Sequence, residues 1–168
     1  MRVGVDEDGE KASLKTLVSA LLLLKRLPRT GWLEEGVKNP ESVASHSYSL
    51  AVMAMAEAEA RGLDVCKAVK MALLHDLAES YTGDLTPATK KKIPKNIFHQ
   101  VERAIIRELV SSLPPHIAQQ YTELYEEYLE RRTPEARLVH RLDRRELVEE
   151  ALWLNKRQKI SLNRFGIA

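Results

Sequence analysis

One histidine lies where helical periodicity places apolar side chains. His46 follows Val43 by three residues and precedes Leu50 by four, so the three side chains share one face of a predicted helix. A single histidine on such a face is more often a hydrogen-bonded core residue than a metal ligand. His46 alone therefore leaves a structural role open.

A second set of ionisable residues follows the apolar run at 71–74. It contains His75, Asp76 and Glu79. Neighbouring residues of a helix point about 100° apart, so His75 and Asp76 can hold an ion between them. Glu79 lies four residues after His75, which places it on the same side of the predicted helix.

Asp143 is the third position of this kind. It lies four residues after Val139 and four before Leu147, on the apolar stripe of the last predicted helix. A buried carboxylate is costly unless it is paired or bound to a metal. The two histidines, Asp76 and Asp143 could all be satisfied by one divalent metal ion between the helices. Separate buried salt bridges could satisfy them as well, and the residues alone leave both explanations open.

The elements that must position these residues are helices. Apolar spacing predicts six, at about 14–27, 41–61, 64–80, 95–112, 115–131 and 134–159. Asp64 and Thr133 are the expected N-caps of the third and sixth. Residues 29–32 are expected to form a turn and residues 81–94 a loop. No alternating run is long enough for a strand, so the predicted fold is an all-α bundle of about six or more helices.

The composition limits the organisation and the partners. A chain of 168 residues fits a single domain over 1–168, with a polar lead at 1–10 and a tail at 160–168. The 26 Lys and Arg against 24 Asp and Glu argue against a nucleic acid as the main partner. Cys66 is the only cysteine, and Leu17–Leu24 is far shorter than the roughly 20 residues that span a bilayer. We therefore expect a cytoplasmic protein with no membrane partner.

The ordered set of His46, His75–Asp76 and Asp143 resembles the H…HD…D signature of the HD-domain metal-dependent phosphohydrolases. A longer resemblance to the HD-domain 5′-deoxynucleotidase family is carried by Leu27–Trp32, Pro40–Ser47, Leu74–Glu79 and Gly83–Pro87. It implies the all-α HD-domain fold, a homodimer, and His46, His75, Asp76 and Asp143 as metal ligands. We expect Mn, Co or Mg at the site, while Zn, Ni or Fe fit the same ligands.

The resemblance also implies roles for residues around the ion. Glu79 would orient or deprotonate the attacking water, although a salt bridge with a lysine of the following loop is the alternative. Asp84 would contact the substrate or donate a proton, unless it only caps a turn.

Four further residues are expected to bind the substrate. Arg29 suits phosphate, and Trp32 would pack on the base or deoxyribose or else pin its turn to the core. Thr86 would add a hydroxyl contact and Lys90 a positive charge.

The function that this resemblance implies is hydrolysis of deoxyribonucleoside 5′-monophosphates, which are small-molecule nucleotide substrates. A pyrophosphohydrolase or phosphodiesterase of the same superfamily, or a non-catalytic metal-containing helical interaction module, remains the alternative. The sequence departs from the family at Ser45 and at Arg144–Arg145, which puts substrate preference in doubt. Glu127 matches a family position whose role the residues do not define.

Overall fold

The computed structural model describes residues 7–167, with side chains from residue 14 onward, and this part of the chain is all-α. The helices are α1 (Glu7–Leu24), α2 (Thr30–Glu34), α3 (Val43–Ala60), α4 (Val65–Leu74), α5 (Glu79–Thr82), α6 (Pro87–Lys90), α7 (Lys95–Val110), α8 (Pro115–Glu130) and α9 (Pro134–Gln158), followed by the 3-10 turn η1 (Asn163–Phe165). The all-α prediction is confirmed, and the six predicted helices correspond to α1, α3, α4, α7, α8 and α9.

The N-caps explain where three of the long helices begin. Ser42 accepts a hydrogen bond from the Ser45 amide and starts α3. Asp64 caps α4 and Thr133 caps α9, as the sequence predicts, and Pro134 occupies the first turn of α9. These caps set the register with which each helix presents its side chains to the core.

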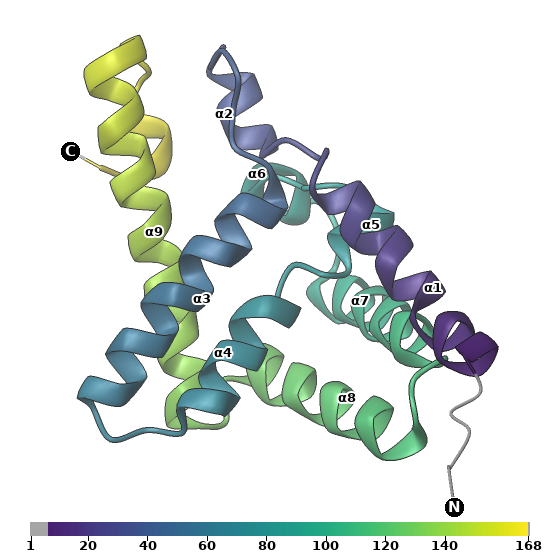
Figure 1. Ribbon diagram of the computed structural model, residues 1–168. Helices are drawn as coiled ribbons and strands as arrows, with labels where there is room; N and C mark the ends of the chain where they lie inside the picture. Colours follow the sequence, from purple (N-terminus) through teal and green to yellow (C-terminus); the bar gives the residue numbers. More distant parts are fainter. Residues whose placement is uncertain (1–6, 168) are drawn as a thin grey trace, which may run out of the picture.

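Helix α3 is the centre of the fold, because it packs against both α4 and α9. Figure 1 shows α3 crossing α9 on one side and lying beside α4 on the other. Helices α7 and α8 pack against each other, and α8 also contacts α4 and α9. Small buried residues on α3, Ala51, Ala54 and Ala58, allow its neighbours to approach closely. The N-terminal end of α3, the C-terminal end of α4 and the middle of α9 thereby converge.

The predicted helix at 64–80 is shorter than expected. Helix α4 ends at Leu74, and the amides of Leu77 and Glu79 bond to carbonyls three residues earlier before α5 begins. The His75 side chain bonds to the Ala72 carbonyl oxygen, in competition with the helical backbone pattern. His75 and Asp76 therefore lie in a tightened turn and not on a regular helix face.

Two segments predicted without helix contain short ones. The expected turn at 29–32 leads into α2, and the expected loop at 81–94 contains α6. Thr86 caps α6 and Pro87 occupies its first turn, a pairing typical of helix starts. Helices of four or five residues have too few turns to show a hydrophobic period, which is why periodicity did not indicate them.

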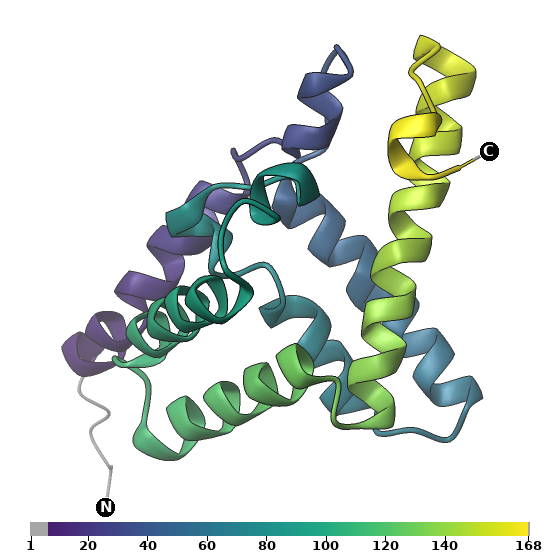
Figure 2. The same ribbon diagram turned by 180° about the vertical axis from the view of Figure 1, so that it is seen from behind.

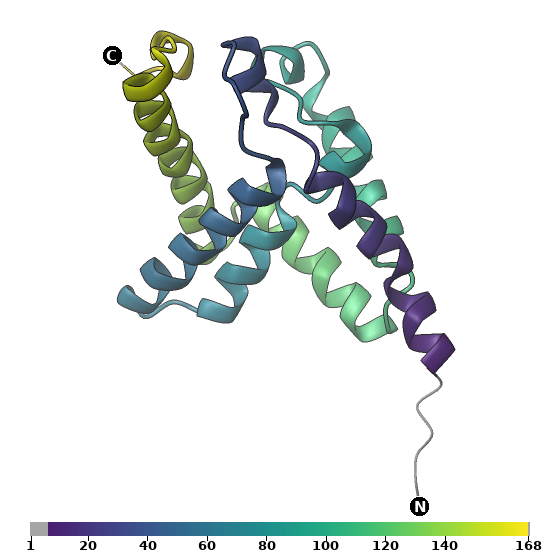
Figure 3. The same ribbon diagram turned by 45° about the horizontal axis from the view of Figure 1, so that its top comes forward.

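The expected polar lead and tail are also corrected. Helix α1 begins at Glu7, inside the predicted lead, and residues 1–6 lie outside the described residues. Residues 160–167 fold back beside α9, on the side facing α2 (Figures 2 and 3). Ile160 and Phe165 join Trp32 and Leu154 in a second apolar cluster. This burial of apolar side chains holds the end of the described chain in place.

Among residues 7–167, none of the helices combines the length and apolar character that crossing a bilayer requires.

Candidate metal centre

His46 lies in the first turn of α3 and is fully buried. Its Nδ1 lies 2.6 Å from Oε2 of Glu146 on α9, a carboxylate that is 7% exposed. An ionised carboxylate can only accept here, so it holds a ring proton on Nδ1 and leaves Nε2 to face the cluster. That Nε2 atom lies 3.2 Å from Asp143 Oδ1 and 3.8 Å from Asp76 Oδ2.

His75 presents the same atom to the same place. Its Nδ1 lies 2.8 Å from the Ala72 carbonyl oxygen, which accepts the ring proton. The remaining nitrogen, Nε2, lies 2.9 Å from Asp76 Oδ2. The ring centroids of His46 and His75 are 5.3 Å apart. The Nε2 atoms of two histidines and two carboxylates, from α3, the end of α4 and α9, therefore face one another.

This arrangement fits a cation. The Nε2 atoms of His46 and His75 are buried and have no hydrogen-bond partner among the described residues. A lone pair next to a carboxylate oxygen is repulsive unless a proton or a metal ion lies between them. Ligand atoms of His46, His75 and Asp143 all lie within 4.8 Å of one another, so these side chains could hold one divalent ion.

The electrostatics of the cluster agree with that fit. Burial alone would lower the pKa of His46, but the neighbouring carboxylates of Asp143 and Glu146 raise the pKa to about 10, so a proton takes the position beside Nε2 when no cation is bound. Burial acts to raise the pKa of Asp76, but the neighbouring His75 lowers that pKa below its usual range. The bond to His46 likewise lowers the pKa of Asp143 against the effect of burial. The cluster thus keeps its carboxylates ionised and attracts positive charge.

Glu79, the first residue of α5, lies beside the cluster and is 5% exposed. Its Oε1 pairs with Lys90 Nζ at 3.3 Å, which is the salt bridge that the sequence left open as the alternative. Its Oε2 is buried and has no hydrogen-bond partner among the described residues. Burial and the charge of Asp76 raise the pKa of Glu79 to about 9, against the opposing charge of Lys90. The salt bridge therefore leaves one oxygen available for a water or substrate.

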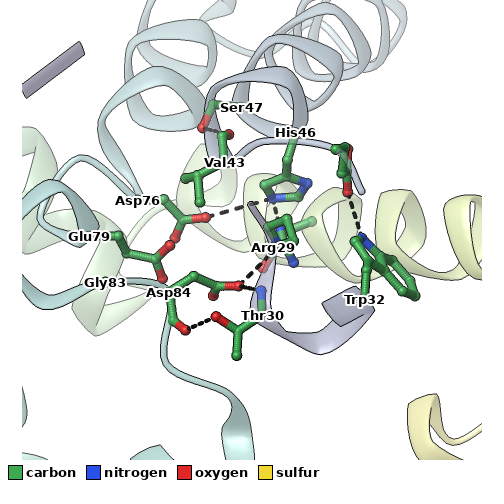
Figure 4. A network of polar contacts seen from close by, with 12 residues as sticks. Arg29, Thr30, Trp32, Val43, His46, Ser47, Asp76, Glu79, Gly83 and Asp84 are labelled. Atoms are coloured by element: carbon green, nitrogen blue, oxygen red, sulfur yellow. Dashed lines mark hydrogen bonds and ion pairs between the residues drawn. The ribbon is translucent and has the colours of Figure 1, made fainter. Parts of the chain in front are cut away.

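Asp84 ties its segment to α2 and lies beside Arg29 (Figure 4). Its Oδ2 accepts from the Thr30 amide at 2.5 Å, and its carbonyl oxygen accepts from Thr30 Oγ1 at 2.6 Å. The same Oδ2 lies 3.9 Å from Arg29 Nε. Arg29 Nη1 is buried without a hydrogen-bond partner in the described part of the chain, so this guanidinium can still donate to an anion.

Trp32 and Thr86 have structural contacts of their own. Trp32 is 1% exposed, donates from Nε1 to Glu41 at 3.0 Å and packs on the ring of Phe165. This is the packing role that the sequence left as the alternative. Thr86 is buried and its hydroxyl caps α6. Both residues still line a pocket of about 520 Å³, together with Arg29 and Asp84.

The positions that depart from the family, and Glu127, lie outside the cluster. Ser45 bonds to Ser42 at the start of α3, and the Arg145 guanidinium lies 3.9 Å from Glu149. Glu127 pairs with Lys67 at 2.6 Å and so connects α8 to α4. Arg144 instead donates to the backbone carbonyl of Phe165.

The residue that sequence reasoning missed is Glu146. A glutamate in a charged helix is ordinarily solvated, so composition gives no reason to select it. Its position could have indicated it, because it follows Asp143 by three residues and so lies on the same face of α9. Metal-binding histidines generally donate their second N–H to such a carboxylate.

Comparison with known proteins places this geometry in a family. A family model described as an HD domain matches residues 22–165. The 5′-deoxynucleotidase HDDC2 of Mus musculus is 38% identical over 143 residues, which cover 85% of this chain and 70% of that protein. The Homo sapiens protein of the same name is 41% identical over 128 residues, which cover 76% of this chain and 61% of that protein. The matched region thus spans about two thirds of the length of these relatives.

Solved structures give the same result. A conserved hypothetical protein from Pyrococcus furiosus superposes with a TM-score of 0.74 at 35% identity, covering 88% of both chains. A structure described as a predicted metal-dependent phosphohydrolase, from Magnetospirillum magnetotacticum, superposes with a TM-score of 0.63 at 29% identity. That match covers 82% of this chain and 71% of the other.

Proposed function

Because this chain belongs to the HD-domain family, we propose that it is a metal-dependent phosphomonoesterase that converts 2′-deoxyribonucleoside 5′-monophosphates to deoxynucleoside and phosphate. The observation that carries the proposal is the pair of buried, unpartnered Nε2 atoms facing Asp76 and Asp143, with Glu79 beside them. Relatives named 5′-deoxynucleotidase, at 38% and 41% identity, support the choice of substrate.

The metal ligands in this proposal are His46, His75, Asp76 and Asp143. A divalent ion held there would polarise a phosphate oxygen and lower the pKa of bound water. We expect Mn, Co or Mg, and Zn, Ni or Fe fit the same nitrogen and carboxylate ligands.

The attacking water is oriented by Glu79, whose Oε2 accepts its proton. Burial and, after it, the charge of Asp76 raise the pKa of Glu79, and a cation bound at Asp76 would remove the second of these contributions. Asp84, whose Oδ2 lies 3.9 Å from Arg29 Nε, contacts the substrate beside the cluster.

The substrate is contacted by residues around Glu79 and Asp84. Arg29 and Lys90 bind the phosphate, because both bring positive charge next to the cluster. Trp32 and Thr86 form walls of the adjoining pocket.

The decisive experiment is phosphate release by metal-stripped protein reloaded separately with Mn, Co or Mg. A deoxyribonucleoside and a ribonucleoside 5′-monophosphate form the matched pair of substrates, and a dinucleotide and a nucleoside triphosphate test for diesterase and pyrophosphohydrolase activity. We expect metal-dependent release that favours the deoxy monophosphate and disappears in Asp76→Asn. Metal binding without release from any of these substrates would favour the non-catalytic module.

We also propose that the protein is a cytoplasmic homodimer. Support for the dimer comes from α1, where several apolar side chains are exposed to solvent: Leu14, Val18, Leu21, Leu22 and Leu23. Sedimentation analysis of the protein and of Leu22→Glu tests this, since a charge in a self-associating surface should produce monomers. Cell fractionation tests the location.

A further inference from the structure

The C-terminal segment, residues 160–167, is fastened to α2 by polar contacts. The Ser161 amide donates to Glu35 Oε2 at 3.2 Å. Arg164 forms ion pairs with both Glu34 and Glu35. Glu34 and Glu35 lie at the C-terminal end of α2, so these contacts hold the segment against that helix. Arg29 lies at the other end of α2, directly before its first residue.

The contacts of Ser161 and Arg164 with α2 position the side chain of Phe165. Its ring centroid lies 4.6 Å from that of Trp32, and the residue is 9% exposed. Arg144 of α9 donates to the Phe165 carbonyl oxygen, which fixes the backbone at the same point. The aromatic ring is therefore held between α2 and α9 by contacts on both sides.

Phe165 belongs to the same pocket as the residues next to the metal cluster. The pocket is lined by Arg29 and Asp84, by Trp32, and by Arg144, Leu147 and Phe165. Arg29 and Asp84 also contact each other beside the cluster. One continuous cavity thus joins the neighbours of the proposed phosphate site to the C-terminal segment.

The size and lining of this cavity fit more than a phosphate group. Its volume of about 520 Å³ lies within the range of roughly 300–1,000 Å³ that small-molecule pockets occupy. Its lining combines apolar side chains with positive charges. If Arg29 holds the phosphate, the rest of the pocket, where Trp32 and Phe165 lie, is left for the sugar and base of the substrate.

We propose that the C-terminal segment forms the wall of the substrate pocket that contacts the nucleobase, with Phe165 as its principal contact. The inference rests on the proposed function for the identity of the substrate. Phe165 is a specificity-determining residue in this assignment and takes no part in the chemical step.

The test compares two variants of the same segment. Phe165 and Ile160 are both buried in the second apolar cluster, but Phe165 lines the pocket and Ile160 does not. Each is changed to alanine in the metal-loaded full chain. Each protein is given a deoxyribonucleoside 5′-monophosphate and 2-deoxyribose 5-phosphate, which lacks only the base.

We expect Phe165→Ala to raise KM for the nucleotide about tenfold, the scale of one lost contact between an aromatic ring and a base. Its kcat for the nucleotide, and its kcat/KM for the sugar phosphate, should stay within about twofold, because the contact is the same in ground and transition states. Ile160→Ala should leave the ratio of the two substrates unchanged. Equal losses on both substrates in Phe165→Ala would overturn the assignment.

A binding measurement separates this inference from the proposed function. Trp153→Phe leaves Trp32 as the only tryptophan, and Glu79→Gln prevents consumption of the substrate. Saturable quenching of Trp32 by 2′-deoxyadenosine 5′-monophosphate, with a midpoint about tenfold higher on adding Phe165→Ala, would support the wall. Absence of saturable quenching would reject the wall even in an active enzyme. If the variant shows saturable quenching but the unmodified protein releases no phosphate, the proposed contact between the base and Phe165 stands and the proposed function is rejected.

Discussion

At the scale of single residues, the centre depends on a carboxylate that touches no substrate. Glu146 accepts the His46 Nδ1 proton at 2.6 Å and so fixes both the ring orientation and the nitrogen that faces the cluster. We expect Glu146→Gln to lower metal affinity roughly tenfold, at the lower end of the loss seen when such partners are changed. Competition with a chromophoric chelator measures it.

The matched control for this prediction is Glu149→Gln, on the same helix but exposed. An unchanged metal affinity in Glu146→Gln would show that His46 needs no such partner. A loss in both variants would point to the general charge of α9 and not to this bond.

Glu102 on α7 predicts a pH dependence of stability in the metal-free protein. Burial raises its pKa from 4.5 to about 7, with a further contribution from Asp76 and an opposing one from Lys90. For an acid with a raised folded-state pKa, the contribution to stability is fully present below pH 4.5 and is lost as the pH rises through 7.

Glu102→Gln has no carboxyl group to ionise and so removes the loss of unfolding free energy that ionisation of Glu102 causes. Between pH 4.5 and 8 its unfolding free energy should gain about 1–2 kcal/mol relative to the unmodified protein, a figure reduced because the residue is only partly buried. Urea unfolding in the presence of a chelator checks this. The exposed Glu108→Gln on the same helix is the control, and parallel pH profiles for all three proteins would contradict the prediction.

At the scale of elements, the sequence predicts the long helices, whose apolar spacing repeats over several turns, and does not predict local features without such a repeat. Long helices such as α3 and α9 show several turns of apolar spacing, and their N-caps Ser42 and Thr133 agree with it. The end of α4 could not be predicted, because the apolar spacing continues past Leu74 and does not show that the His75 side chain bonds to the Ala72 carbonyl oxygen. The four residues proposed as metal ligands could still be selected from the sequence, since each stands out against an apolar run whatever the local turn.

The link between α5 and Asp84 depends on Gly83, whose φ of 73° and ψ of 166° form a backbone conformation that is essentially limited to glycine. We expect Gly83→Ala to lower the unfolding free energy by about 1–3 kcal/mol and to reduce phosphate release as Asp84 is displaced. Gly62→Ala, also at positive φ but between α3 and α4, is the matched control. It should lose stability and keep its activity at a temperature where both variants are folded.

At the scale of the whole molecule, the proposed ion adds a link between elements that already pack against one another. Its ligands come from α3, from the turn after α4 and from α9, so it binds only the folded chain. An ion present at about a hundred times its Kd should stabilise the fold by about 2.7 kcal/mol. Thermal unfolding with and without chelator measures this, and Asp143→Asn should abolish the difference. Equal melting temperatures for the unmodified protein would show that the cluster does not hold an ion.

The bond between His46 and Glu146 joins residues that are 100 positions apart. Loop closure over such a length precedes any stabilising contact between them, so the centre forms late in folding. During synthesis, α9 leaves the ribosome after α3 and α4, and it carries both Asp143 and the partner of His46. A nascent chain therefore lacks part of the proposed ligand set until translation has passed α9.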